Sequence, residues 1–401
     1  MIRAKAFVVL LAAAAAAMLL GGCGAGGAAA GLAANQPVVN PGSGCSASAA
    51  NCSWQQITLN AAMLGPTDTF QSIYAAKDSY VYVGTSVNGT WRARISALEA
   101  DPANGSAWSR IDSGFPPDPL HGGTAYPTTW AEDSSGKLYA ALGETATGYF
   151  CTYCVVGKWN GTSWTFSSNP AGMRMAILSM TFDGSGNLYV NDRQAAFYKS
   201  TDGGATFGPA LITDAYTRFG FTSGWVYASK IINGLMYWGG EGPYMVSPLD
   251  FSTGTAVYGN AGFKGNATVI ASDGTASTAP TYILEGSRCD SSAAGNCLAR
   301  YDAASGQWTS LPQTFTIRRD SLLHGIVAGE YLASFGAGGG AGGGGVMRST
   351  DMGLTWALYD AGLPTPEQNF AGALAVSPVD GSKYLSTGTA ASVPNELWYH
   401  P

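Results

Sequence analysis

Short apolar segments alternate with polar turns along most of the chain, and one arrangement recurs. Each repeat has a tyrosine within an apolar segment, and most have an earlier apolar segment that ends in a turn such as MTFDGSG or SKIING. Asp-Gly and Asn-Gly turns of this kind are typical of tight β-hairpins, because glycine tolerates a positive φ. The tyrosines are Tyr82, Tyr139, Tyr189, Tyr237, Tyr282, Tyr331 and Tyr384, about 50 residues apart on average.

Two further segments complete the repeat. A third apolar segment follows the tyrosine, as in VVGKW and VMRST, and an aromatic residue then marks a fourth. These aromatic residues are Trp108, Trp164, Phe207, Trp308 and Trp356. Four antiparallel strands in about 50 residues are typical of one blade of a β-propeller. Residues 52–401 are therefore predicted to form an all-β, seven-bladed β-propeller.

The two ends of this region predict how the ring closes. The last repeat has only three segments, whereas residues 54–59, which contain Trp54, form one segment with no repeat before it. We therefore predict that the N-terminal strand completes the final blade, which would also remove exposed sheet edges. A pair of β-sandwich domains is the alternative, but it would not explain tyrosines at one period.

The N-terminus has the features of an export signal. Arg3 and Lys5 precede an apolar run over residues 6–20, which is too short to span a bilayer. Leu20-Gly21-Gly22-Cys23 resembles the lipobox of bacterial lipoproteins. The resemblance implies a signal peptide over residues 1–22 and acylation of Cys23, and Gly24 after the cysteine indicates anchoring in the outer membrane. An ordinary secretory signal is the alternative. Residues 23–51 are predicted to be a Gly/Ala-rich tether with a small disulfide loop.

Six cysteines remain after Cys23, in three local couples, which favours pairing within each couple in an oxidising compartment. The couples are Cys45 with Cys52, Cys151 with Cys154, and Cys289 with Cys297. The Cys151-x-x-Cys154 spacing has two other interpretations, a redox dithiol and half of a zinc site. A zinc site needs further ligands nearby, and the chain has only three histidines. We therefore expect structural disulfides and no metal.

Composition restricts the class of protein. Charged residues are 11% of the chain, against a usual share of about 25%, while glycine and aromatic residues are abundant. This composition excludes a disordered acidic chain and a helical bundle. The formal net charge of -6 argues against nucleic acid, which requires a basic surface. No cofactor is expected.

Two turns between third and fourth segments share the pattern S-x-D-x-G-x-x-aromatic. They are Ser200, Asp202, Gly204 and Phe207, and then Ser349, Asp351, Gly353 and Trp356. Both resemble the Asp-box, or BNR repeat, of sialidases, sortilin-type receptors and a photosystem II assembly factor. The resemblance implies a structural turn on the face of a propeller away from the ligand. In such a turn the aspartate accepts backbone N–H bonds and the aromatic residue packs between blades.

Much of the scarce charge lies in loops that meet at one mouth of a propeller channel. These loops are the links between blades and the connections from second to third strands. Polar and aromatic side chains that converge on a concave mouth are typical of a ligand site, although loops are also polar because they contact water. The candidate ligand-binding residues are Tyr126, Glu144, Arg174, Arg193, Tyr216, Arg218, Glu241, Tyr244, Glu285, Arg318 and Arg319.

A sialidase-like glycoside hydrolase is the catalytic alternative. The resemblance would imply three arginines on the substrate carboxylate, a Tyr–Glu nucleophile pair and an aspartic acid/base. The Arg-Ile-Pro signature of that family is missing, and the nearest string, Arg94-Ile95-Ser96, is expected on a third strand. The carboxylates that a hydrolase would use are Glu241, Glu285 or Asp192.

The sequence thus predicts an exported, lipid-anchored propeller that associates with the membrane through its anchor. It is expected to bind a glycan or an envelope protein, or to assist assembly, without catalysis. A glycoside hydrolase and an assembly factor for an envelope protein complex are the alternatives.

Overall fold

The structure is a computed structural model, and the description concerns the compact unit over residues 41–401. It describes residues 53–401 apart from residues 66–67, 118–123, 144–153, 171–172, 174, 223, 241–243, 257–266, 273–280, 286–297, 303–306, 312–316, 328, 336–344, 364–370 and 388–394. The predicted signal peptide, Cys23, the tether and the Cys45–Cys52 loop lie outside these residues.

Within the described residues, the strands form seven antiparallel sheets in chain order. The first contains β2 (Phe70–Ala75), β3 (Tyr80–Thr85), β4 (Thr90–Arg94) and β5 (Ser109–Arg110). The second contains β6 (Tyr126–Glu132), β7 (Leu138–Gly143), β8 (Val155–Trp159) and β9 (Trp164–Phe166). The third contains β10 (Ile177–Phe182), β11 (Leu188–Asp192) and β12 (Phe197–Ser200). The fourth contains β13 (Val226–Ile232), β14 (Leu235–Gly240), β15 (Met245–Pro248) and β16 (Thr255–Ala256).

The remaining sheets follow the same order. The fifth contains β17 (Ala267–Ser272), β18 (Thr281–Glu285), β19 (Leu298–Asp302) and β20 (Gln307–Leu311). The sixth contains β21 (Ile317–His324), β22 (Tyr331–Phe335), β23 (Gly345–Ser349) and β24 (Ala357–Leu358). The last has the order β25 (Ala371–Val376), β26 (Lys383–Thr387), β27 (Leu397–His400) and β1 (Gln55–Ile57).

Within the described ranges, three short helices lie between strands. Helix α1 (Ile95–Ala100) and the 3-10 helix η1 (Gly105–Ala107) lie between β4 and β5, and α2 (Ala215–Arg218) lies between the third and fourth sheets. No helix in the described part of the chain is long and apolar enough to cross a bilayer.

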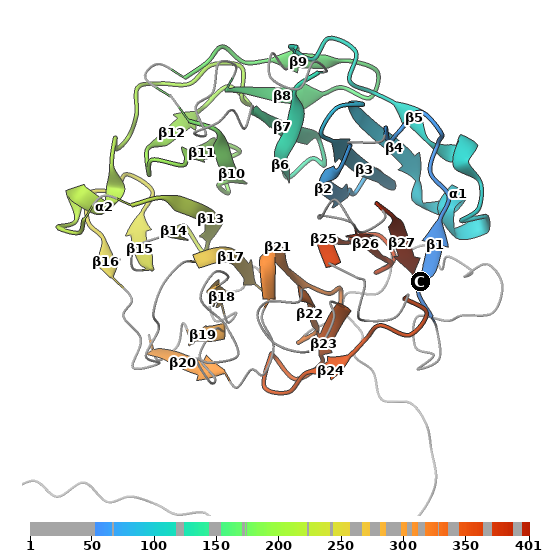
Figure 1. The fold of residues 1–401 in the computed structure, drawn as a ribbon. Coiled ribbons are helices and arrows are strands. Elements are labelled where there is room, and N and C mark those ends of the chain that lie inside the picture. The colour runs from blue at the N-terminus through green and yellow to red at the C-terminus, as the bar shows by residue number, and fades with distance from the viewer. Residues whose placement is uncertain are drawn as a thin grey trace, which may run out of the picture. The chain divides into compact units, whose positions relative to one another are not determined.

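The first strands of the sheets surround a common centre (Figure 1). Each of β2, β6, β10, β13, β17, β21 and β25 contacts the next in this order, and β25 contacts β2. Each sheet therefore has one neighbour on either face, and apolar side chains fill the interfaces. Between the first and last sheets, for example, Ile73 and Val83 belong to the same buried cluster as Leu397 and Tyr399.

Hydroxyl groups also connect neighbouring first strands. The Ser72 hydroxyl of β2 donates to the carbonyl of Pro127 at 2.9 Å, and the Thr128 hydroxyl of β6 donates to the carbonyl of Ile177 at 2.8 Å. In β10, Ser179 lies 2.5 Å from the hydroxyl of Ser229 in β13. These bonds satisfy buried polar groups and fix the height of each strand relative to the next.

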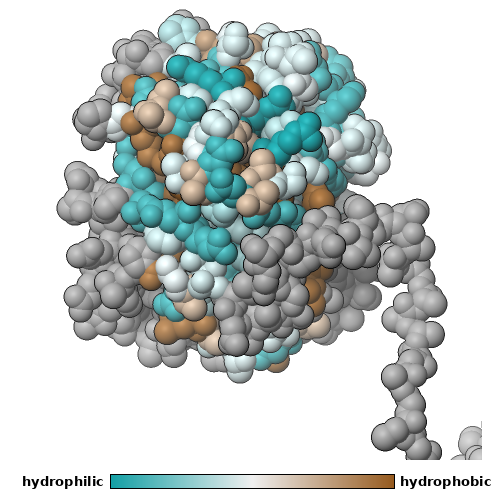
Figure 2. Space-filling model, turned by 90° about the vertical axis from the view of Figure 1, so that its right-hand side faces the viewer, coloured by the Kyte–Doolittle hydropathy of each residue, from teal (hydrophilic) through white to brown (hydrophobic). Residues whose placement is uncertain are grey.

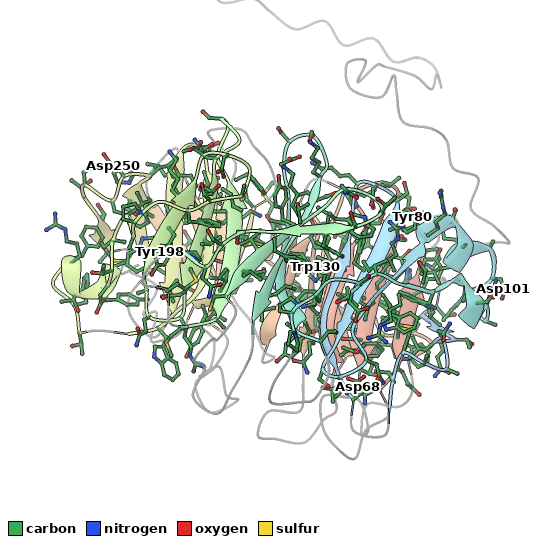
Figure 3. The ribbon with its side chains drawn as sticks, turned by 90° about the horizontal axis from the view of Figure 1, so that it is seen from above. Asp68, Tyr80, Asp101, Trp130, Tyr198 and Asp250 are labelled. Carbon is green, nitrogen blue, oxygen red and sulfur yellow. The ribbon has the colours of Figure 1, made fainter. Side chains whose placement is uncertain are left out.

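The sheets have two distinguishable ends. We name the end with the first-to-second and third-to-fourth strand turns the hairpin end, and the end with the inter-sheet links the link end. In the edge view, Asp250 of the β15–β16 turn and Asp68, which precedes β2, lie at opposite ends (Figure 3).

The recurring tyrosine joins its strand to the preceding hairpin. Tyr82 donates to Asp78 at 2.5 Å, Tyr139 to Asp133 at 3.3 Å, and Tyr189 to Asp183 at 3.4 Å. The three residues are at most 2% exposed, and burial is the main reason that the pKa of each phenol is raised. The tyrosine fills the core while its hydroxyl holds the hairpin aspartate.

The two S-x-D-x-G turns close through their aspartates. Asp202 accepts hydrogen bonds from the backbone of Ala205 and Thr206, both at 3.0 Å, and Asp351 accepts one from the backbone of Thr355 at 2.8 Å. The adjoining Gly204 has φ +82°, a value that a larger residue rarely adopts.

One predicted strand is absent. The segment at Phe207 forms no strand, and the third sheet has three strands with an isolated bridge between Phe197 and Ile212. Gly208 and Pro209 follow Phe207 directly. Proline has no N–H to donate to a strand ladder, so regular pairing is interrupted there.

The Arg94-Ile95-Ser96 string also differs from expectation. Arg94 is the last residue of β4, but Ile95 and Ser96 are the first residues of α1. Ile95 and Leu98 are buried, so the apolar spacing of this segment fits a helical turn against the sheet rather than a longer strand.

Strand β1 pairs with β27, with Gln55 opposite Tyr399 and Ile57 opposite Leu397. The Trp54 indole, in a residue only 2% exposed, donates to the carbonyl of Tyr359 at 2.6 Å. The first described strand therefore covers the outer edge of the last sheet. In Figure 2, polar and apolar residues are interspersed on the side that carries α1 and β1.

We expect Asp202→Ala and Asp351→Ala each to lower the free energy of unfolding at pH 7 by about 1 kcal/mol, since exposed charge-assisted bonds are screened by water. The pKa of both carboxyls is lowered, chiefly by the hydroxyls of Thr206 and Thr355. A lowered pKa stabilises the fold above the unfolded-state value of about 4, and this stability is lost as the pH falls through the folded-state value. In chemical denaturation, the deficit of each variant should shrink below about pH 4. A deficit that is the same at pH 7 and pH 3 would contradict this prediction.

Candidate functional site

Where the structure describes them, inter-sheet links and second-to-third strand turns contact one another at the link end. Val87 donates its backbone N–H to the carboxylate of Asp68 at 2.9 Å, which joins a turn to the link before β2. In the third and fourth sheets, the Val226 N–H donates to the carbonyl of Arg193 at 3.2 Å. Residues far apart in sequence therefore reach one surface, as the sequence predicted for the mouth.

A cavity of about 360 Å³ lies among the first strands. None of the described residues that line it carries a charged side chain. Serine and threonine hydroxyls, two phenols and apolar side chains form its wall. The polar members are Gln71, Ser72, Tyr74, Thr128, Thr129, Ser179, Tyr227 and Ser229. The channel suits an uncharged polar group or water better than an ion.

An arginine and two aromatic residues lie beside this cavity. The guanidinium of Arg193, in the turn after β11, lies 3.4 Å from the ring centre of Trp225 and 5.9 Å from that of Tyr227. The two aromatic rings are 6.3 Å apart and nearly perpendicular. A cation over an aromatic face in a desolvated site is stabilised by about 2 kcal/mol. Because Tyr227 also lines the cavity, this aromatic cluster adjoins the channel.

The three residues differ in exposure, which separates their roles. Arg193 is 4% exposed, whereas Trp225 and Tyr227 are partly exposed. The arginine therefore holds the indole in place from behind. The aromatic faces are the part of the cluster that a ligand can reach.

Asp192 precedes this arginine and is 2% exposed. Its carboxylate accepts a hydrogen bond from the Ala196 N–H at 3.0 Å and is also bonded by the backbone of Gln194. Burial raises the pKa of Asp192 to about 6. A carboxyl of this pKa can donate or accept a proton near neutral pH, but here its oxygens bind the turn of its own backbone.

Three other described carboxylates at the link end are also engaged by hydrogen bonds from loop residues. Both carboxylate oxygens of Asp112 accept hydrogen bonds from the Arg110 guanidinium, at 2.7 and 2.8 Å. Asp214 accepts the Thr217 N–H at 3.0 Å at the start of α2, and Asp68 accepts bonds from the β3–β4 turn. Their positions are explained by loop structure. In the described ranges, no group of three or more His, Cys, Asp or Glu side chains could hold a metal ion.

The predicted binding residues do not share one environment. Tyr126, Tyr216 and Tyr244 are buried, at 3%, 0% and 4% exposure, and Tyr216 packs against Trp238 with ring centres 5.0 Å apart. Arg218 is exposed at the end of α2. Direct ligand contact by the three buried tyrosines would require their surroundings to open.

The other predicted residues lie outside the described side chains. Glu144, Arg174 and Glu241 are outside the described residues, and Glu285, Arg318 and Arg319 lie in β18 and β21 without a described side chain. Of the six cysteines predicted to pair, only Cys154 is described, and it is buried before β8. These assignments stay predictions.

Sequence reasoning missed Trp225 and Tyr227. They stand at the start of a first strand, directly after the link that contains α2. The sequence prediction rested on charged residues and therefore did not include these two. Two aromatic residues separated by one position at the start of a first strand would have indicated them.

Comparison with known proteins addresses the fold. No family model matches the chain, and no curated protein matches it. Among solved structures, U3-55K has a TM-score of 0.56 at 13% identity, covering 86% of this chain and 100% of that one. YCF48 from Cyanidioschyzon merolae has a TM-score of 0.56 at 11% identity, covering 87% and 98%. The chain is a β-propeller.

A third similar structure is an enzyme. The GH74 enzyme of Niastella koreensis has a TM-score of 0.56 at 16% identity, covering 86% of this chain and 55% of the enzyme. Identities this low support a shared propeller fold and leave the function to be argued from the site.

The titration of Asp192 gives a test of the site geometry. Its folded-state pKa of about 6 lies above the unfolded-state value of about 4, so the wild type loses stability as the pH rises from 4 to 6. Asp192→Asn removes this titration and keeps an oxygen for the turn. The free energy of unfolding of the variant minus that of the wild type should therefore increase by about 3 kcal/mol between pH 4 and pH 7. Denaturation curves with no such relative change would contradict the buried position of this carboxyl.

Proposed function

We propose that this protein is an exported, lipid-anchored propeller of seven blades that binds a ligand at the link end without catalysing a reaction. The ligand would be a glycan or an envelope protein. The observation that best supports this proposal is that the Arg193 guanidinium lies 3.4 Å from the ring centre of Trp225, beside a channel that Tyr227 lines.

The aromatic cluster supports binding because it is both rigid and accessible. Arg193 and the neighbouring backbone hold Trp225 in one orientation, so little side-chain entropy remains to be lost on binding. Indole and phenol rings offer flat apolar faces with polar edges. Such faces suit sugar rings and the side chains of an extended peptide. A solved neighbour, YCF48, is bound to a D1 peptide in one structure.

A closed ring of seven blades supports this function by making the platform rigid. Each of the seven sheets would be one blade, and β1 would complete the last one. Contacts between successive first strands, the β25–β2 contact and the β1–β27 pairing support closure. A closed ring leaves few sheet edges exposed.

The anchor and the oxidising compartment rest on the sequence. The apolar run before Cys23 and the three local cysteine couples support export, acylation and disulfide formation. Two or three acyl chains would hold the protein stably at a membrane.

A glycoside hydrolase is the second candidate, and the raised pKa of Asp192 favours it. A general acid needs such a pKa. The backbone bonds of this carboxylate favour a structural role instead. A hydrolase would also need Glu241, Glu285 or another carboxylate about 5–5.5 Å or 6.5–9.5 Å from its partner in one cleft.

The exported protein should be incubated with a glycan library and a peptide library, scoring both retention and cleavage. We expect retention without cleavage. Trp225→Ala should weaken the binding of each retained ligand by at least about fivefold, since one aromatic stacking contact is worth about 1–3 kcal/mol.

The matched control is Tyr80→Ala. Tyr80 is also a partly exposed aromatic residue beneath arginine, with Arg92 at 4.4 Å, but it lies at the hairpin end. Its replacement should leave affinity unchanged. Equal losses in both variants would contradict a site at the link end, and cleavage that Asp192→Asn abolishes would establish the hydrolase.

A further inference from the structure

Exposed apolar side chains gather on the sixth sheet. Within the described ranges, seven large apolar residues are exposed, and five of them belong to this sheet or its turns. The most exposed are Leu358 at 63%, Val327 at 59% and Ile326 at 50%, followed by Leu354 at 45% and Met352 at 40%. Large apolar groups that cluster in this way mark an interaction site more often than scattered ones do.

Four of these residues form one surface at the hairpin end. Ile326 and Val327 lie in the β21–β22 turn, and Met352 and Leu354 lie in the β23–β24 turn. The two turns are in contact, because the Met352 N–H donates to the carbonyl of Gly329 at 3.0 Å. We call these four residues the apolar tip.

The chain before β1 reaches the fold at this same end. His400 is opposite Lys383, the first residue after the β25–β26 turn, and the Trp54 ring lies 5.4 Å from the His400 ring. The β25–β26 turn in turn contacts the apolar tip, since a Cβ on Gly381 would lie 2.6 Å from the Ile326 side chain. The N-terminal segment therefore joins the propeller near the apolar tip.

The length of this segment places the anchor within reach. Residues 24–52 separate Cys23 from the first described residue. A Gly-rich chain of this length has an expected end-to-end distance of about 30 Å. A lipid on Cys23 would thus hold the hairpin end near the bilayer.

The charged residues near the apolar tip indicate whether it would favour anionic or zwitterionic lipid. The nearest described basic residue on this sheet, Arg348, pairs with Glu330 at 2.7 Å. Asp351 stands in the β23–β24 turn beside Met352, and Asp380 stands in the adjoining β25–β26 turn. Because the described side chains of these turns include no cluster of exposed basic residues, attraction to anionic headgroups is weak, and the contact would depend on apolar burial in the interface.

We propose that the apolar tip docks on the surface of the bilayer that holds the Cys23 lipid, which orients the link end away from the membrane. This inference rests on the proposed anchor. It gives the propeller one membrane-facing end and one ligand-facing end, and it favours zwitterionic lipid.

Met352 is a built-in reporter, because peroxide converts an accessible methionine to its sulfoxide. The exported protein carrying Leu211→Met is placed on phosphatidylcholine nanodiscs, since Leu211 is 38% exposed in the segment between β12 and α2. Oxidation of Met352 should be at least about fivefold slower than oxidation at position 211. After proteolytic release from the disc the two rates should become similar.

Ile326→Ser with Val327→Ser should abolish the protection of Met352, whereas Leu235→Ser, an exposed leucine of the fourth sheet, should leave it unchanged. Adding anionic lipid should not increase protection. Equal oxidation at both positions on the disc would overturn the proposal, as would protection that persists after release and reports self-association or a protein partner.

Whether Cys23 is acylated is measured separately, from the mass of the N-terminal peptide. If Cys23 is unmodified, a histidine tag in the tether attaches the same protein to nickel-chelating lipid. The ratio of the two oxidation rates then scores docking independently of acylation.

Discussion

The pairing of β1 with β27 is the contact on which the proposed closed arrangement of the sheets depends. Each sheet covers the faces of its two neighbours, so a gap at any interface would expose apolar side chains on both sides. At the interface between the first and last sheets, the chain leads from β1 of the last sheet to β2 of the first. Three residue pairs and the buried Trp54 join the ends there.

The two ends of the molecule use polar residues differently. At the hairpin end, tyrosine–aspartate bonds and the Asp202 and Asp351 turns repeat the same local solution in several sheets. At the link end, the cluster of Arg193, Trp225 and Tyr227 occurs beside one sector of the channel. Regular turns thus support the scaffold, while irregular loops carry the candidate site, as is usual in proteins.

Much of the fold could be predicted from the sequence, because the information was local and periodic. The tyrosines identified second strands, since each one must fill a core and reach its hairpin. The prediction of a strand at Phe207 is wrong, because Gly208 and Pro209 interrupt regular pairing directly after this aromatic residue. The candidate site was less predictable. Charge in loops identified Arg193, but its stacking on Trp225, 32 residues later in the chain, depends on how two sheets pack. The burial of Tyr216 by Trp238 has the same cause.

The most direct test of the account compares the stability of two shortened chains. One begins at residue 53 and keeps β1, and the other begins at residue 58 and lacks it. Because the second chain loses the buried Trp54 and Ile57, its free energy of unfolding in chemical denaturation should be lower by at least about 4 kcal/mol. Equal stability of the two chains would contradict the claim that β1 holds the sheets in a closed arrangement.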